Sequence, residues 1–139
     1  MPSRKIKVYL AGQANEYENN WKEKFKKIEE FDFHDWEFDS DQTSPDTYFP
    51  DDLNGIDKAE FMVANPGLAP SEGTWIEIGY FYGQHVKQPG DFCKNLIIIW
   101  KENRNPKWSI DFVNKTGFVV KTVDEAIVKL KGISNCKMK

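Results

Sequence analysis

A chain of 139 residues, 40% of them hydrophobic and 14% aromatic, has the size and composition of one globular domain. A net charge of −3 argues against a protein that grips a nucleic-acid polymer, and no apolar run approaches the roughly 20 residues of a membrane span. The N-terminus lacks a signal-peptide pattern, and Cys93 and Cys136 form no metal-ligand or disulfide pattern. We therefore expect a soluble, reduced, cytoplasmic protein with a single domain over residues 1–139.

Strand and helix patterns alternate along the chain. β-rich apolar segments predict strands over residues 5–11, 31–38, 59–64, 96–100 and 117–121. Apolar residues at helical spacing predict helices over residues 15–30, 72–85 and 123–130, and a short helix or turn over 51–58. We expect an acidic, proline-containing loop over residues 39–52, an N-cap at Thr122 and a frayed tail after Gly132.

Strands that alternate with helices indicate an α/β fold, with a parallel sheet of about five strands covered by helices on both faces. Such sheets bind ligands in the crevice at the carboxyl ends of their strands. The loops that follow the strands, over residues 12–15, 65–73 and 101–108, are therefore the expected place for a site.

Residues 71–80, with the sequence SEGTWIEIGY, follow the third predicted strand and lead into a helix. Glu77 lies between two isoleucines, within about the first turn of that helix, where the helix dipole stabilises an anion and free N–H groups can hold a polar ligand. Gly73 allows a ligand to approach the backbone, and Gly79 allows close packing of helix on sheet. The segment therefore suits a functional carboxylate in the crevice.

An ordinary structural role for the same segment stays open. A glutamate near a helix start is often a capping partner, and Ser71 or Thr74 could be the cap. The spacing alone does not decide between a capping role and a functional one.

Four segments together resemble the nucleoside 2-deoxyribosyltransferase family. They are Val8–Gly12, the run from Asp52 through Ile56 to Glu60, Met62–Asn65, and Gly73–Tyr80 with its GT..E.G pattern. The resemblance covers roughly the first two-thirds of the chain and implies a flavodoxin-like (Rossmann-like) fold. It also implies a homo-oligomer in which a neighbouring subunit completes the site. We expect no cofactor and no metal, since no metal-ligand spacing appears in the sequence.

The resemblance implies three catalytic roles. Glu77 matches the family's nucleophile, Tyr9 matches the tyrosine that positions it, and Asp52 matches a residue that acts near the base. Breaking an N-glycosidic bond creates positive charge at C1′ of the sugar, which a carboxylate can stabilise before forming a glycosyl ester. The leaving base needs a proton, and Asp52 is the candidate acid. A hydrogen bond from Tyr9 is expected to fix Glu77 and keep it ionised.

Residues expected to contact the substrate are Gly12, Gln13, Ser71, Gly73, Thr74 and Trp75. Ser71 stands where deoxyribosyltransferases commonly carry an aspartate; relatives that hydrolyse nucleoside 5′-monophosphates resemble this chain there, because a serine can donate to phosphate. The neighbouring Glu72 would repel a phosphate unless it turned outward. Gln13 could contact a base or be a turn residue, and Trp75 could stack on a base or pack in the core.

Several functions therefore stay open. The main expectation is transfer of a 2-deoxyribosyl group between nucleobases, and the first alternative is hydrolysis of a nucleoside 5′-monophosphate. A phosphoribohydrolase with a PGG.GT..E motif ranks third, because the paired glycines are missing here. A module that binds nucleosides or nucleotides without catalysis is the remaining alternative. We expect His34 and His85 to have structural or surface roles, and the acidic segment to fold over the base as a mobile loop.

Overall fold

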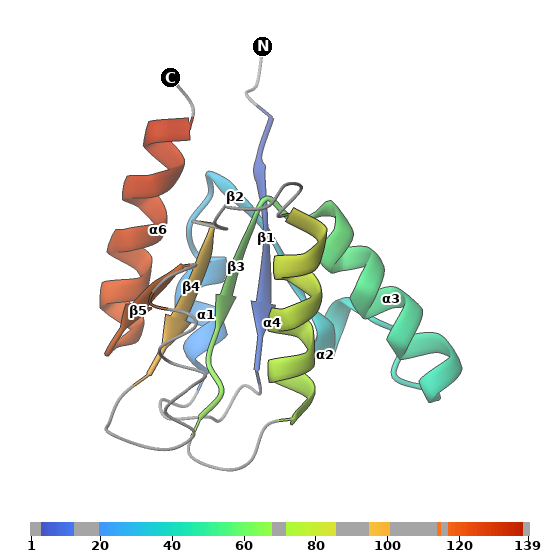
Figure 1. Ribbon diagram of the computed structural model, residues 1–139. Coiled ribbons are helices and arrows are strands. Elements are labelled where there is room, and N and C mark those ends of the chain that lie inside the picture. Colours follow the sequence, from blue (N-terminus) through green and yellow to red (C-terminus); the bar gives the residue numbers. More distant parts are fainter. Residues whose placement is uncertain are drawn as a thin grey trace.

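The computed structural model describes residues 4–12, 20–67, 72–85, 95–100, 114 and 117–137. Within these residues, five parallel strands form one sheet in the order β2-β1-β3-β4-β5 (Figure 1). The strands are β1 (Ile6–Ala11), β2 (Phe31–Asp35), β3 (Phe61–Ala64), β4 (Leu96–Ile99) and β5 (Phe118–Val120). The helices are α1 (Trp21–Lys26), α2 (Trp36–Asp39), α3 (Pro45–Lys58), α4 (Glu72–His85) and α6 (Val123–Lys137). The predicted α/β fold is confirmed.

The strand order is that of a flavodoxin-like sheet, in which the winding direction reverses between β1 and β3. A crevice forms at the carboxyl ends of the two strands at such a reversal. Here those ends lie side by side, because Ala11 pairs with Ala64 in the register of β1 and β3. The fold thus puts the expected ligand position next to Gly12 and Asn65.

The two faces of the sheet carry separate cores because successive residues of a strand point to opposite sides. Val8 and Leu10 of β1 join a core that also contains residues of α1 and α6. Tyr9 and Ala11 of β1 join the core formed with α3 and α4 on the other face (Figure 1). Tyr9 therefore points towards the helices that carry Asp52 and Glu77.

The segment between β2 and β3 differs from the sequence prediction. Strand β2 ends at Asp35, and the short helix α2 replaces the expected end of the strand. The predicted acidic loop over residues 39–52 is wrong in its second half, because α3 already begins at Pro45. Ser44 and Thr47 form a capping box, and proline suits the first helical position, where no N–H is needed. Two prolines that suggested a loop are thus part of a helix.

The other helices depart from the prediction at two ends. Helix α1 ends at Lys26, before the predicted end at residue 30. Helix α4 has the predicted bounds, and Thr122 caps α6 as expected, since its Oγ1 accepts the N–H of Glu125 at 3.0 Å. The predicted frayed tail after Gly132 is wrong, because α6 continues to Lys137 and buries Ser134. No helix in the described part of the chain is long and apolar enough to cross a membrane.

Candidate active site

A hydrogen bond joins β1 to α4 at the centre of the site. Tyr9 is fully buried in β1, and its hydroxyl donates to Oε2 of Glu77 at 2.5 Å. Ile78 and Phe81 fix the rotation of α4 by packing on the sheet, which brings Glu77 against Tyr9. Glu77 is the sixth residue of α4 and so belongs to its second turn, deeper than expected. The contact predicted between Tyr9 and Glu77 is present; their catalytic roles stay predictions.

Burial governs the protonation of this pair. It raises the pKa of Glu77 to about 7, with the Asp52 charge adding to the effect, while the Tyr9 hydrogen bond and the Lys22 charge lower it. The expectation that Tyr9 keeps Glu77 ionised is therefore only half right, because loss of water outweighs the hydrogen bond. Burial and the Glu77 carboxylate raise the pKa of Tyr9 far above its usual range, so Tyr9 stays a donor.

Asp52 faces the same pair from α3. Its carboxyl is half-buried, and Oδ1 is buried without a hydrogen-bond partner in the described part of the chain. Burial raises the pKa of Asp52, whereas a hydrogen bond from Ser40 and the charge of His34 lower it. The Asp52 charge in turn raises the pKa of Glu77, so the two carboxyls interact electrostatically. A buried carboxyl with one open oxygen suits a proton donor.

His34 and Ser40 belong to the site although the sequence analysis gave neither a chemical role. The His34 ring stacks on the Tyr9 ring, with centroids 5.2 Å apart and planes 13° from parallel. Its Nε2 lies 3.1 Å from Oγ of Ser40. One signal could have found His34: parallel register puts it beside Tyr9, on the same face of the sheet.

A buried ion pair lies beside the site, and no pattern in the sequence predicted it. Nζ of Lys22 is 2.8 Å from Oδ1 of Asp35, and each side chain is only 1% exposed. Lys26 contacts the second Asp35 oxygen at 2.7 Å. The Lys22 charge lowers the pKa of both Glu77 and Asp52. The pair thus connects the end of β2 to α1 and adds positive potential to the site.

Gly12 has a structural reason to be glycine. Its φ of +128° is unfavourable for other residues, and an added Cβ would lie 2.4 Å from the carbonyl oxygen of Asn65. Its own carbonyl accepts the indole N–H of Trp36 at 3.1 Å. Gly12 therefore lets β1 and β3 end in close contact at the crevice.

The other predicted binding residues have mixed outcomes. Gly73 is exposed, with nothing within 4 Å of an added Cβ, and Thr74 lies buried inside α4 and so is not its cap. Trp75 is half-buried and meets Trp100 edge-on, with ring centroids 5.8 Å apart. The packing role expected of Gly79 is wrong, because that residue faces open space. Gln13 and Ser71 lie outside the described residues.

The expected mobile loop over the base is not what the acidic segment forms. Asp41 accepts hydrogen bonds from the backbone and hydroxyl of Thr43, and its own N–H donates to Asp51 at 2.8 Å. These contacts attach the start of α3 to the turn before it. Among the described residues, no three metal-ligating side chains gather in one place.

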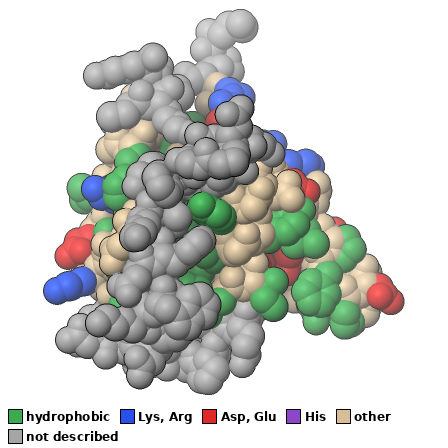
Figure 2. All heavy atoms as spheres, in the orientation of Figure 1, with side chains coloured by type: hydrophobic (Ala, Val, Ile, Leu, Met, Phe, Trp, Pro, Cys, Tyr) green, Lys and Arg blue, Asp and Glu red, His purple; other side chains and the backbone are tan. Residues whose placement is uncertain are grey.

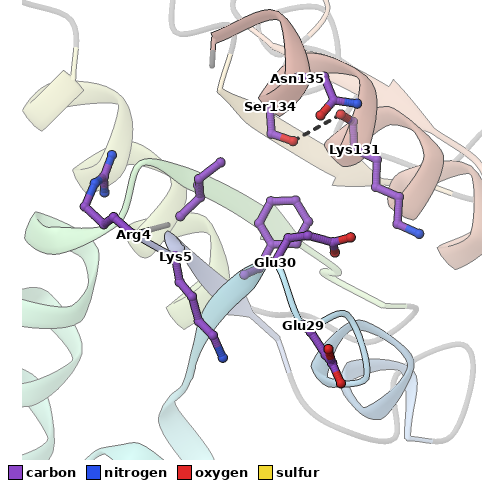
Figure 3. Close-up of a pocket in the computed structure, with 9 residues that line it drawn as sticks. Arg4, Lys5, Glu29, Glu30, Lys131, Ser134 and Asn135 are labelled. Carbon is purple, nitrogen blue, oxygen red and sulfur yellow. Dashed lines mark hydrogen bonds between the residues drawn. The ribbon is translucent and has the colours of Figure 1, made fainter. Parts of the chain in front are cut away.

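A separate hollow of about 460 Å³ lies at the amino-terminal edge of the sheet (Figure 3). It is lined by the starts of β1 and β2 and the end of α6. Arg4 on its rim binds Glu60 through two hydrogen bonds, and the Ser134 hydroxyl donates to the Lys131 carbonyl. Tyr9 and Glu77 do not line this hollow, which belongs to the end of the sheet opposite the crevice.

Comparison with known proteins identifies relatives by structure. No protein-family model and no curated protein matches the sequence. The chain is similar to a conserved protein from Enterococcus faecalis V583, with a TM-score of 0.69 and 12% identity over 93% of this chain and 99% of that one. It is similar to the Clostridium botulinum CMP N-glycosidase BcmB, with a TM-score of 0.62 and 22% identity over 91% of this chain and 99% of that one. It is also similar to BlsM, with a TM-score of 0.56 and 20% identity over 88% of this chain and 84% of that one.

These likenesses establish the fold over most of the chain. One of the three neighbours carries the name of an N-glycosidase. The likenesses confirm the predicted fold, and the resemblance to the nucleoside 2-deoxyribosyltransferase family beyond the fold stays a prediction.

Proposed function

We propose that the chain cleaves the N-glycosidic bond of a nucleoside or a nucleoside 5′-monophosphate, with Glu77 as the nucleophile. The observation that carries the proposal is the partly buried Glu77 carboxylate, held by Tyr9 and interacting electrostatically with a second carboxyl, Asp52, on the face of the sheet beside its crevice. Two carboxyls, one to attack the sugar and one to protonate the leaving group, are what retaining cleavage of a glycosidic bond requires.

The first displacement uses both carboxyls. Tyr9 occupies Oε2 of Glu77, so Oε1 attacks C1′ in this proposal. The C1′–N bond breaks as the C1′–O bond forms, and its electrons go to the base, which takes a proton from Asp52. The products are a free base and a glycosyl ester of Glu77.

The second displacement restores the enzyme. A water molecule or a second base attacks C1′ from the face that the first base left, and Asp52 accepts the proton of the attacking group. The ester bond breaks and its electrons return to the Glu77 carboxylate. Two displacements retain the configuration at C1′.

The identity of the acceptor separates the two candidate reactions. The sequence favours transfer of a 2-deoxyribosyl group, in which a second base is the acceptor. Similarity to a CMP N-glycosidase supports the alternative, in which water is the acceptor and the substrate is a nucleoside 5′-monophosphate. Ser71 supports the same alternative, because its hydroxyl can donate to a phosphate where an aspartate would repel one.

A second subunit is proposed to complete the site. Exposed positions of α4 recur at helical spacing in Gly73, Ile76, Gly79 and Gly83, and Ile76, next to Glu77, is 63% exposed. On the same side of the molecule, Figure 2 shows hydrophobic side chains at the surface over α3, where Phe49 is 52% exposed. We expect Ile76→Glu to lower the molecular mass measured by light scattering relative to the wild type. If the wild type and the variant are both monomers, the proposal of a second subunit is wrong.

Parallel incubations test the reaction. One tube holds a 2′-deoxynucleoside with a different free base, and the other holds the matching 5′-monophosphate alone. A new nucleoside in the first indicates transfer; free base from the monophosphate alone indicates hydrolysis. Glu77→Gln should abolish either product, and Glu23→Gln on the exposed surface of α1 is the matched control. If no base is released from any substrate, the proposal is wrong, and a ligand-induced rise in melting temperature would identify a binding module.

A further inference from the structure

His34 lies in a fixed position between β1 and α3. Its ring stacks on Tyr9 on one side, with centroids 5.2 Å apart. On the other side is Gly55 of α3, where an added Cβ would lie 2.9 Å from each of three His34 ring atoms. Equal distances to three ring atoms mean that Gly55 faces the flat side of the imidazole. The His34 ring is thus held between the Tyr9 ring and the bare backbone of α3.

This arrangement explains why residue 55 is glycine. Real Cβ atoms do not approach ring atoms within 3.0 Å, so any other residue would push His34 away. The His34 ring would then press on the Tyr9 ring, whose hydroxyl holds Glu77 at 2.5 Å. Close packing transmits such a displacement rather than absorbing it.

The same imidazole connects to the second carboxyl. Nε2 of His34 is 3.1 Å from Oγ of Ser40. Both residues act on Asp52, since the Ser40 hydroxyl and the His34 charge lower the pKa of its carboxyl. The Ser40 hydroxyl has one proton. When it donates that proton to ionised Asp52, it must accept a hydrogen bond from His34 Nε2. When Asp52 is protonated, the chain can reverse, with Asp52 donating to Ser40 and Ser40 donating to His34.

We propose that His34 is a positioning residue for both carboxyls, acting on Glu77 through the Tyr9 ring and on Asp52 through Ser40. Packing alone would not require histidine, since phenylalanine could stack on Tyr9 equally well. The imidazole nitrogen is what extends the contact to Ser40. This inference rests on the proposed function for its consequence in catalysis, but the coupling itself belongs to the folded protein without substrate.

Charged groups surround this unit on several elements. A groove of about 300 Å³ between β2 and α3 reaches His34 and Gly55. Its charged lining residues are Lys7, Asp32, Asp39 and Lys58. On the inner side are Asp52 and its neighbour Asp51, Glu77 beside Tyr9, and Lys22 with its partner Asp35. Nearby charges affect the pKa of a carboxyl. The informative quantity is therefore the difference in the Asp52 pKa between the wild type and variants that keep these charges.

Three variants separate the two connections. His34→Phe keeps a ring on Tyr9 but removes the nitrogen, and Ser40→Ala removes only the hydroxyl. Gly55→Ala keeps both polar groups and displaces the ring. Gly132→Ala is the matched control, because Gly132 also lies in a helix but an added Cβ meets nothing within 4 Å.

The measurement is a carboxyl titration by NMR on the substrate-free protein with ¹³C-labelled Asp and Glu. We expect Ser40→Ala and His34→Phe to raise the pKa of Asp52 with little change at Glu77, and Gly55→Ala to shift Glu77 as well. In assays of base release, each of these three variants should lower kcat by about tenfold or more and change KM by no more than about twofold. A loss of kcat of this size is typical of an impaired acid–base contribution. Gly132→Ala should match the wild type in both the titration and the turnover.

Two outcomes overturn different statements. If the Asp52 and Glu77 titrations of His34→Phe and Ser40→Ala coincide with those of the wild type, His34 is not a positioning residue and this inference is wrong. If the titrations shift as expected but the wild type releases no base, the proposed function fails while the coupling stands. Should Gly55→Ala not fold, the other two variants still decide whether His34 acts on Asp52. His34→Ala, which removes the ring from Tyr9, then tests the connection to Glu77, and an unchanged Glu77 titration would overturn that connection.

Discussion

The Tyr9 hydroxyl and Oε2 of Glu77 lie 2.5 Å apart, although 68 positions separate the two residues in the chain. The contact exists because Tyr9 lies on the α4 side of β1 and because Ile78 and Phe81 fix the rotation of α4. It is a partly buried hydrogen bond, and loss of such a bond costs more than at the surface.

Tyr9→Phe removes one oxygen atom and leaves the ring in place. We expect the pKa of Glu77 to rise above about 7, because burial is then opposed by one favourable contact fewer. An NMR titration of the Glu77 carboxyl measures this. Tyr80→Phe is the matched control, since its hydroxyl donates to Asp57 at 2.8 Å away from the site. An unchanged Glu77 pKa in Tyr9→Phe would show that the hydrogen bond has no electrostatic effect.

Asp52→Asn should change the shape of the pH–rate profile. The proposed reaction needs Glu77 ionised and Asp52 protonated together, so kcat/KM of the wild type should be bell-shaped with one limb close to pH 7. Asparagine does not titrate, so the variant should keep only a rising limb, at or below pH 7, because the Asp52 charge no longer raises the pKa of Glu77. A falling limb that persists in Asp52→Asn would exclude Asp52 as the acid.

Glu77→Gln should stabilise the protein at alkaline pH. The folded-state pKa of about 7 lies above the usual 4.5, so the folded protein holds the Glu77 proton more tightly than the unfolded chain does. This favourable contribution is complete below pH 4.5 and is lost as the pH rises through 7. At pH 8 the variant should therefore gain up to about 3 kcal/mol in unfolding free energy, and little at pH 4. Equal effects at both pH values in urea unfolding would contradict the raised pKa.

Lys22→Met should destabilise the fold by about 3–5 kcal/mol, because it leaves the buried Asp35 carboxylate without its inner partner. Lys26→Met is the natural comparison. Lys26 binds the same carboxylate from a 26% exposed position, and its removal should cost less than about 1 kcal/mol. Urea unfolding of both variants gives the difference, and equal losses would mean that burial of the Lys22 contact adds nothing.

The sheet and the central contact were predictable from the sequence because their signals are local. Short apolar runs give the strands, and the GT..E.G pattern gives Glu77 on a helix after β3. Tyr9 follows from the same resemblance. Only the first half of helix α3 was missed, because Pro45 and Pro50 suggested a loop there, although proline at a first helical position is favourable. The second half was predicted as a short helix or turn over residues 51–58.

The remaining parts of the site depend on packing between distant segments. His34 faces Tyr9 only through the parallel register of β1 and β2, and it fits only because Gly55 brings bare backbone to its ring. Neither contact is marked by a characteristic spacing of residues in the sequence. The pKa of Glu77 was misjudged for a similar reason. The family resemblance implied the hydrogen bond from Tyr9, which lowers this pKa. The larger effect of burial, which raises it, depends on how completely other elements exclude water from Glu77.

The most direct test of the central claim is a search for the glycosyl ester on Glu77. The protein is incubated with a 2′-deoxynucleoside or its 5′-monophosphate carrying fluorine at C2′, which slows both displacements by destabilising positive charge at C1′. It is then quenched in acid and digested for mass spectrometry. We expect that the peptide containing Glu77 gains the mass of the sugar, and that Glu77→Gln gains nothing and releases no base. A modified residue elsewhere, or base release by Glu77→Gln at the wild-type rate, would contradict it.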